Sequence, residues 1–443
     1  MNKIFKVLWN KVRATSVVTD EAKTAHGKGR QGVLSTTLGA ATVTGTASLL
    51  FVLSPIAMAA STITPGWNNT TVSSKDGVHN IKTNAIQGTV GINKFDQFEI
   101  VQKEIANLQF GSANKLLNFV NQQIKVDGTV NAVKDNKIGG DLYFISPQGM
   151  VVGSTGVINA GSLSVATPKQ STYDEWLTQA DTPSMYADRL VDTIDSGHYA
   201  INPAGIITVN GSINAGNRIA LRAKEITVGS TGALKTGVDD FANLVNIKNG
   251  TATVSAGLDP KLEFSVDSNS GDIILAARAE VESAGIISES KQGSTDQENV
   301  QATITVEKGG TVTAQGNIKA TAEAGNGEYD LVKAAGSDKE GDYDFKVNEA
   351  TQSYNVTATV TINGTLTAGG DIDLKAHAFN LVDNSFGFNL ATITEQAGGG
   401  FANALSGSTV AYADADAVSK VVVGESGVVQ AQNGSVNAEA ITT

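Results

Sequence analysis

The sequence predicts an all-β fold, a right-handed parallel β-helix (β-solenoid) with short helical and loop excursions. Three observations predict it: a pattern that recurs along the chain, apolar residues that alternate with polar ones inside each copy, and Gly or Asn-Gly pairs between the alternating runs. The composition agrees, since 47 Gly with only 7 Pro and 6% aromatic residues favours short strands and turns. A β-sandwich would also show short strands, but it would not repeat one pattern in the same phase.

The repeated pattern is clearest in residues 207–223, ITVNGSINAGNRIALRA. It reads as three very short strands in which Val209, Ile213, Ile219 and Leu221 point inward, because alternation at period two buries one face of a strand. Gly and Asn at the corners adopt positive φ at little cost. Further copies lie at residues 151–166, 226–236, 304–320, 360–376 and 421–438.

The spacing of the copies predicts the number of coils. Val209 and Val228 are 19 residues apart, which is one coil, whereas Val306 to Val360 spans 54 residues and Val360 to Val422 spans 62, near three coils each with insertions. At about 20 residues per coil and about 4.8 Å per coil, residues 61–443 then form roughly 12–16 coils and a rod of roughly 60–75 Å. About six inward side chains contribute roughly 1.5–3 kcal/mol each, less than the cost of ordering a coil, so each coil depends on its neighbours.

The N-terminal 60 residues have the three parts of a secretory signal. Residues 1–30 carry seven Lys or Arg, residues 31–60 carry no charge, and the segment ends Ala57-Met58-Ala59-Ala60 with small residues before the expected cut. Cleavage after Ala59 or Ala60 is the prediction. A retained membrane anchor is the alternative, because the uncharged stretch is long enough to span a bilayer.

The rest of the chain excludes several kinds of chemistry. Residues 61–443 carry 25 basic and 42 acidic side chains, so nucleic acid and anionic lipid are not expected partners. The absence of Cys excludes disulfides and thiolate sites. The four His lie far apart, and residues 267–272 resemble a calcium loop less than a solvated turn, so no catalytic residue, metal ligand or cofactor is predicted.

Two segments interrupt the repeats. Residues 168–201 lack alternation, and Trp176, Leu177, Tyr186, Leu190 and Ile194 fall at helical spacing, which predicts a short helical insertion that either packs on the coils or serves as a binding knob. Residues 323–356 are polar, acidic and Gly-rich and predict a solvated loop.

Residues 126–130 (VDGTV) and 139–153 (GGDLYFISPQGMVVG) resemble the secretion domain of two-partner-secreted exoproteins, the filamentous haemagglutinins and leukotoxin-type filamentous adhesins. The resemblance covers residues 63–166, and residues 1–11 resemble the extended signal peptides of type V secreted proteins. Those domains carry an Asn-Pro-Asn-Gly-Ile motif where this chain has Ser146-Pro147-Gln148-Gly149-Met150. Downstream, Asn202-Pro203-Ala204-Gly205-Ile206 matches the motif better.

Since no catalytic constellation is found, a protein without enzymatic activity is expected. The resemblance implies a right-handed β-helix that is secreted to the surface of a diderm bacterium. Its implied partners are an outer-membrane two-partner-secretion pore, which either reads the proline motif or leaves it a purely structural turn, and a receptor on host or bacterial cells. It meets membranes only in transit. Adhesion is the function expected, with cytolysis as an alternative and a polysaccharide-active β-helical enzyme as a further one.

The domains expected are a signal peptide (1–60), a secretion domain (61–167), an insertion (168–201) and β-helix repeats (202–443). Because the chain stops directly after a repeat copy without a polar cap, we expect either a longer parent protein or an open end that pairs with another chain.

Cleavage of the signal is directly testable. N-terminal sequencing of the secreted protein should start at Ala60 or Ser61, because the small residues precede those positions. Finding Met1 on the surface-associated protein would contradict cleavage and support the membrane anchor.

Overall fold

The computed structural model describes residues 5–10, 15–20, 60–180, 186–238, 245–248, 251–254, 271–280, 298–325, 350–379 and 411–442. The chain divides into two units, Met1–Ala57 and Met58–Thr443. In the first unit, β1 (Phe5–Asn10) pairs antiparallel with β2 (Thr15–Asp20). The signal-cleavage residues Ala57 and Ala59, and the calcium-like turn apart from Gly271 and Asp272, lie outside the described residues.

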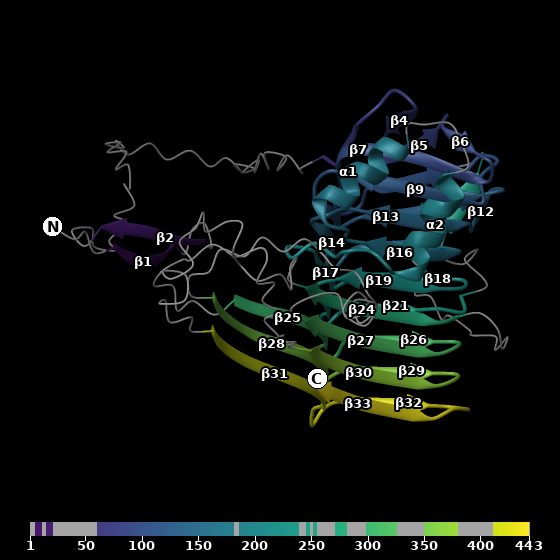
Figure 1. Ribbon diagram of the computed structural model, residues 1–443. Coiled ribbons are helices and arrows are strands. Elements are labelled where there is room, and N and C mark those ends of the chain that lie inside the picture. Colours follow the sequence, from purple (N-terminus) through teal and green to yellow (C-terminus); the bar gives the residue numbers. More distant parts are fainter. Residues whose placement is uncertain are drawn as a thin grey trace, which may run out of the picture. The chain divides into compact units, whose positions relative to one another are not determined.

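The second unit is a stack of coils with three strands each, and strands of successive coils pair in parallel (Figure 1). The first ladder contains β10 (Ile124–Val126), β14 (Gly149–Val152), β17 (Ile206–Val209), β20 (Glu225–Val228), β25 (Glu298–Val306), β28 (Ala350–Ile362) and β31 (Ala411–Val423).

The second ladder contains β5 (Val78–Thr83), β8 (Ile105–Gln109), β11 (Thr129–Lys134), β15 (Val157–Ala160), β18 (Ser212–Ala215), β21 (Ala233–Lys235), β26 (Thr311–Ala314), β29 (Thr365–Ala368) and β32 (Val428–Ala431). The third contains β7 (Val90–Ile100), β9 (Lys115–Val120), β13 (Asp141–Ile145), β16 (Ser162–Ala166), β19 (Ile219–Ala223), β24 (Ile273–Glu280), β27 (Ile318–Gly325), β30 (Ile372–Phe379) and β33 (Val436–Thr442). The predicted parallel β-helix is confirmed.

The core lies inside the coils and follows the predicted alternation. Val209, Ile213, Ile219 and Leu221 are all fully buried, as predicted. Successive coils place like residues over one another, so that Val165, Leu221 and Leu275 form one column. Each inward side chain therefore packs mainly against the coils above and below it, which is why stacking and not the single coil supplies stability.

The predicted number of coils is wrong. Ile304 pairs directly with Val360, and Val360 pairs with Val421, so each of these long intervals is one coil and not three. Within the described residues the first ladder has seven strands, and the end of β7 pairs with the first of them. The seven spacings between neighbouring strands, at about 4.8 Å each, make a ladder of about 34 Å. The physical reason is that the chain leaves a corner and returns to the same register, so extra residues add no coil.

Antiparallel strands cover the N-terminal end of the β-helix. β3 (Thr62–Pro65) and β6 (Ile86–Gln87) pair antiparallel with β7, and β4 (Thr70–Lys75) pairs antiparallel with β5. These strands satisfy backbone groups that a first coil would leave unpaired. Elsewhere, β12 (Lys137–Ile138) pairs antiparallel with β11. The strands β22 (Val245–Lys248) and β23 (Thr251–Val254) pair antiparallel with each other.

The expected helical insertion contains two helices, α1 (Gln170–Gln179) and α2 (Tyr186–Ser196). They lie on the outward side of the third ladder (Figure 1). There Trp176, Leu190 and Ile194 join a second apolar cluster with Leu117 and Phe119 of β9. The packed alternative is therefore observed, with Leu177 partly buried at the edge of the cluster and Tyr186 44% exposed.

The expected loop at residues 323–356 needs correction at both ends. Residues 323–325 belong to β27 and residues 350–356 to β28, while residues 326–349 lie outside the described residues. Ala322, Ala324 and Val356 are buried at the spacing of strand positions. Small and polar residues can thus continue a strand when the neighbouring coil supplies the pairing.

A core substitution tests the column arrangement. Leu221→Ala should lower the free energy of unfolding by about 2–5 kcal/mol, because it leaves a cavity between Val165 and Leu275. Thr227→Ala, on the outward face of β20, is the control and should cost less than about 1 kcal/mol. Equal losses in urea unfolding would contradict this core.

Candidate functional site: a corner of stacked proline turns

The two proline motifs lie on the same corner of the β-helix, in successive coils. The first, Ser146–Met150, joins β13 to β14, and the second, Asn202–Gly205, leads from the helical insertion into β17. Strands β14 and β17 pair in register with Gly149 opposite Ile206, so the turns that precede them are stacked. The sequence treats them as separate copies of one motif, whereas the structure makes them one surface, here called the proline corner.

The first turn is closed by main-chain and hydroxyl hydrogen bonds. The amide of Gly149 donates to the carbonyl of Ser146 at 3.1 Å. The Ser146 hydroxyl donates to the carbonyl of Gln122 in the preceding coil at 2.8 Å and accepts from the Gln148 amide at 3.3 Å. Ser146 therefore both shapes the turn and ties it to the coil before it.

The second turn is closed in a similar way, with Asn in place of Ser. The amide of Gly205 donates to the carbonyl of Asn202 at 2.8 Å, and the Ala204 amide donates to Oδ1 of Asn202 at 2.9 Å. The Asn202 amide donates to the carbonyl of Thr167 at 2.9 Å, where the insertion leaves the coil. An isolated bridge between Pro168 and Ile201 brings the two ends of the insertion together. The turn therefore returns the chain to the register it left.

Glycine is required at the contact between the two turns. Gly149 has φ of +85°, and a Cβ there would lie 1.9 Å from the carbonyl oxygen of Ile206. A Cβ on Gly205 would lie 2.5 Å from Oγ1 of Thr167, which is fully buried. Both the left-handed backbone and the close approach exclude a side chain at Gly149.

The proline corner presents only part of the motif to solvent. Pro147, Gly149 and Met150 are buried, and the Met150 side chain belongs to the interior core. Gln148, Pro203 and Ala204 are exposed. Ile206, which the sequence places inside the better-matching copy of the motif, is 37% exposed beside them.

Asn121 joins the corner to the helices and was missed by sequence reasoning. Its carbonyl accepts from Nε2 of Gln148 at 3.5 Å, its Oδ1 accepts from the Tyr173 hydroxyl at 2.9 Å, and its Nδ2 donates to Oδ1 of Asp96 at 2.9 Å. No local pattern marks it, because its partners come from β7, the first turn and α1. The helical insertion and the proline corner are thus one connected surface.

The second unit begins at Met58, close to the expected cleavage site. Ala60 is exposed, and the main-chain nitrogen of Ser61 donates to Oε2 of Glu104 at 3.0 Å. The Ser61 hydroxyl accepts from the Val101 amide at 3.0 Å. Ser61 is therefore held on the coil by two contacts while Ala60 is not buried.

Among the residues that the structure describes, no group of three or more His, Asp or Glu could hold a metal ion. Neither α1 nor α2 is long and apolar enough to cross a bilayer, and no other helix is described.

The N-terminal segment matches a known family. Residues 1–52 match the family described as Extended Signal Peptide of Type V secretion system. No curated protein matches the chain.

Two solved structures resemble the chain. The filamentous hemagglutinin secretion domain is 15% identical, with 85% of this chain and 99% of that one covered and a TM-score of 0.35. The HMW1 secretion domain from Haemophilus influenzae is 13% identical, with the same coverage and a TM-score of 0.31.

The signal-peptide match establishes the route of the chain. An extended type V signal peptide directs a protein to export across the inner and outer membranes of a Gram-negative bacterium, so the expected secreted location is confirmed. The expected extended type V signal peptide is confirmed by this match, and the parallel β-helix expected after it is present.

The contact between the turns gives a paired test. Gly149→Ala should lower the free energy of unfolding by at least about 1–3 kcal/mol, because it combines a left-handed backbone with a clash against Ile206. Gly139→Ala is the matched control and should change it by less than about 0.5 kcal/mol, since a Cβ there has no atom within 4 Å. If the two variants unfold at the same denaturant concentration, the stacking of the corner is wrong.

Proposed function

We propose that the chain is the exported member of a two-partner secretion pair and acts as an adhesin at the bacterial surface. The observation that carries the first half is the proline corner, which follows a type V signal peptide and exposes Gln148, Pro203 and Ala204 in one place. An outer-membrane pore that accepts one exoprotein needs a feature that other periplasmic chains lack. Two proline turns in successive repeats supply such a feature.

The adhesive half rests on the kind of scaffold. A β-helix with a covered N-terminal end offers long outward faces whose side chains do not contribute to the core. Outward positions can therefore vary without loss of stability, which suits recognition of surfaces on host or neighbouring cells.

Secretion tests the first half. With the cognate pore co-expressed, Gln148→Ala combined with Pro203→Ala should leave cleaved protein in the periplasm, because both residues are exposed on the corner. Ser154→Ala, exposed on a different corner, should be secreted like the wild type. Undiminished secretion of the double variant, with its folding confirmed by circular dichroism, would show that the proline corner only shapes the coil and is not recognised by the pore.

Adhesion tests the second half. Bacteria that export the chain should bind cultured host cells or other bacteria more than bacteria in which the pore gene is deleted, and purified protein should compete with that binding. Purified protein should not lyse erythrocytes. Lysis without binding would contradict adhesion and favour the cytolytic alternative.

A further inference from the structure

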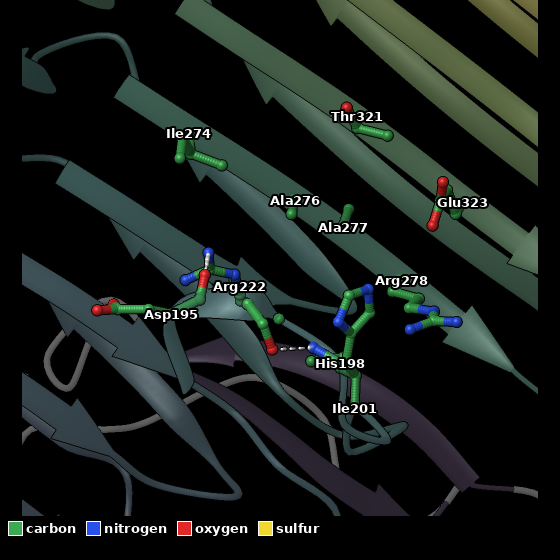
Figure 2. A pocket seen from close by; sticks show the side chains of 12 residues that line it. Asp195, His198, Ile201, Arg222, Ile274, Ala276, Ala277, Arg278, Thr321 and Glu323 are labelled. Carbon is green, nitrogen blue, oxygen red and sulfur yellow. Dashed lines mark hydrogen bonds between the residues drawn. The ribbon is translucent and has the colours of Figure 1, made fainter. Parts of the chain in front are cut away.

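A pocket of about 420 Å³ lies where the helical cover of the third ladder ends. One wall is the C-terminal end of α2 with the turn at residues 195–198, and the other is the outward side of β24 and β27 (Figure 2). The apolar contacts of the helices reach Ala166 of β16, and the turn at residues 195–198 lies against Arg222 of the next strand, β19. The outward side of β24 and β27 beyond Arg222 lines the pocket.

Arg222 is the unusual residue of this pocket. The residue is only 6% exposed, and its Nη2 donates to the main-chain carbonyl of Asp195 at 2.7 Å. Its Nη1 is buried and has no hydrogen-bond partner. Gly197, with φ of +73°, lets the turn lie on the guanidinium, since a Cβ there would be 2.8 Å from Nε. A buried cationic N–H without an acceptor is costly, so the site favours an anion.

The neighbouring carboxylate does not complete this site. The Asp195 side chain forms an ion pair with Arg218 and accepts a hydrogen bond from the Tyr143 hydroxyl at 3.0 Å. Its carboxylate is therefore paired with Arg218. It also attracts the Arg222 guanidinium electrostatically, but the hydrogen bond from Arg222 goes to the main-chain carbonyl of Asp195. Burial lowers the pKa of Arg222, but a guanidinium remains charged at neutral pH.

The opposite wall adds room and hydroxyl-binding groups. Arg222, Ala276 and Thr321 are successive partners across β19, β24 and β27, and all three line the pocket. The side chain of Ala276 is only a methyl group. Arg278 and Glu323 lie beyond them, also paired in register (Figure 2). The pocket therefore has hydrogen-bond donors and acceptors next to the Arg222 guanidinium. Such a site suits a small molecule that carries several hydroxyl groups and one carboxylate.

We infer that this pocket binds the carboxylate of a small hydroxylated ligand, such as a hexuronate, through Arg222. The inference stands apart from the adhesive function, since it concerns a small molecule and not a cell surface. An arginine is suited to this task because its fork matches carboxylate geometry.

Calorimetric titration of the purified chain with glucuronate, glucose and inorganic phosphate tests the site. Glucuronate should bind, while glucose and phosphate should bind at least about tenfold more weakly. Arg222→Gln should weaken glucuronate binding by at least about tenfold. Ala276→Glu should abolish it, because it places a carboxylate beside Arg222. Arg189→Gln, exposed on α2, should bind like the wild type.

Thermal unfolding of each variant shows whether Arg222→Gln lowers the stability of the protein as well as its ligand binding. In that case Ala276→Glu, which leaves Arg222 in place, decides. Absence of glucuronate binding to the wild type, equal binding of glucose or phosphate, or unchanged binding by a folded Ala276→Glu variant would each overturn the inference.

A second, independent inference concerns Ser61. Its main-chain nitrogen lies 3.0 Å from Glu104, whose Oε2 is also 2.8 Å from Nε2 of His79. Burial acts to raise the pKa of Glu104, but its hydrogen bonds with Ser61 and His79 outweigh this and hold the pKa below its usual value. The carboxylate is therefore charged and directed at the nitrogen that cleavage after Ala60 would turn into an ammonium group.

We propose that the mature chain starts at Ser61 and that its ammonium group pairs with Glu104. This ion pair would hold the first residue at the N-terminal end of the β-helix. This rests on the predicted cleavage. A hydrogen-bonded ion pair is stronger than a hydrogen bond from a neutral amide, so cleavage would stabilise the N-terminal end of the β-helix.

Melting temperatures of two forms of the protein test the ion pair. In the secreted protein Glu104→Gln should lower the melting temperature by about 2–4 °C, more than in the uncleaved full chain made in the cytoplasm. Glu175→Gln, exposed on α1, should change neither form. A sequenced N-terminus other than Ser61, or equal shifts in both forms, would contradict the ion pair.

Discussion

Parallel pairing between successive coils is the constraint on which the rest of this structure depends. A coil of three short strands has no partner within itself for most of its amides and carbonyls, so each coil requires the register of the next. Register is fixed because a shift by one residue would turn the inward column outward. Chain length between strands is not fixed: Ile226 pairs with Ile207 one short coil earlier and with Ile304 after a long excursion.

The functional surfaces follow from this constraint. The proline corner exists because β14 and β17 are neighbours, although the helical insertion separates them in sequence. The pocket at Arg222 exists because that insertion covers the third ladder only as far as β19. In each case the stacked coils supply a rigid base, and an excursion from a corner supplies the variable part.

The sequence predicted the local features of the fold well. Alternation identified the inward residues such as Val209 and Leu221, and helical spacing identified Trp176, Leu190 and Ile194 as a packed stripe. It failed on the coil count, since a long interval between copies can hold either several coils or one excursion. Contacts set by register, such as Gly149 against Ile206 and Arg222 against Ala276, were likewise out of reach, because no local pattern encodes which strands stack.

Engineered cysteines test the central claim, that intervals of very different length each form one coil, and the chain has no native cysteine to interfere. Thr305 and Thr361 are in-register neighbours on β25 and β28, about 4.8 Å apart, within the range of a disulfide. Thr305→Cys with Thr361→Cys should oxidise to an intramolecular disulfide. Thr227→Cys with Thr361→Cys, two coils apart at about 9–10 Å, should not. A disulfide in the second pair and none in the first, read by mass spectrometry of peptides from the folded protein, would contradict the account.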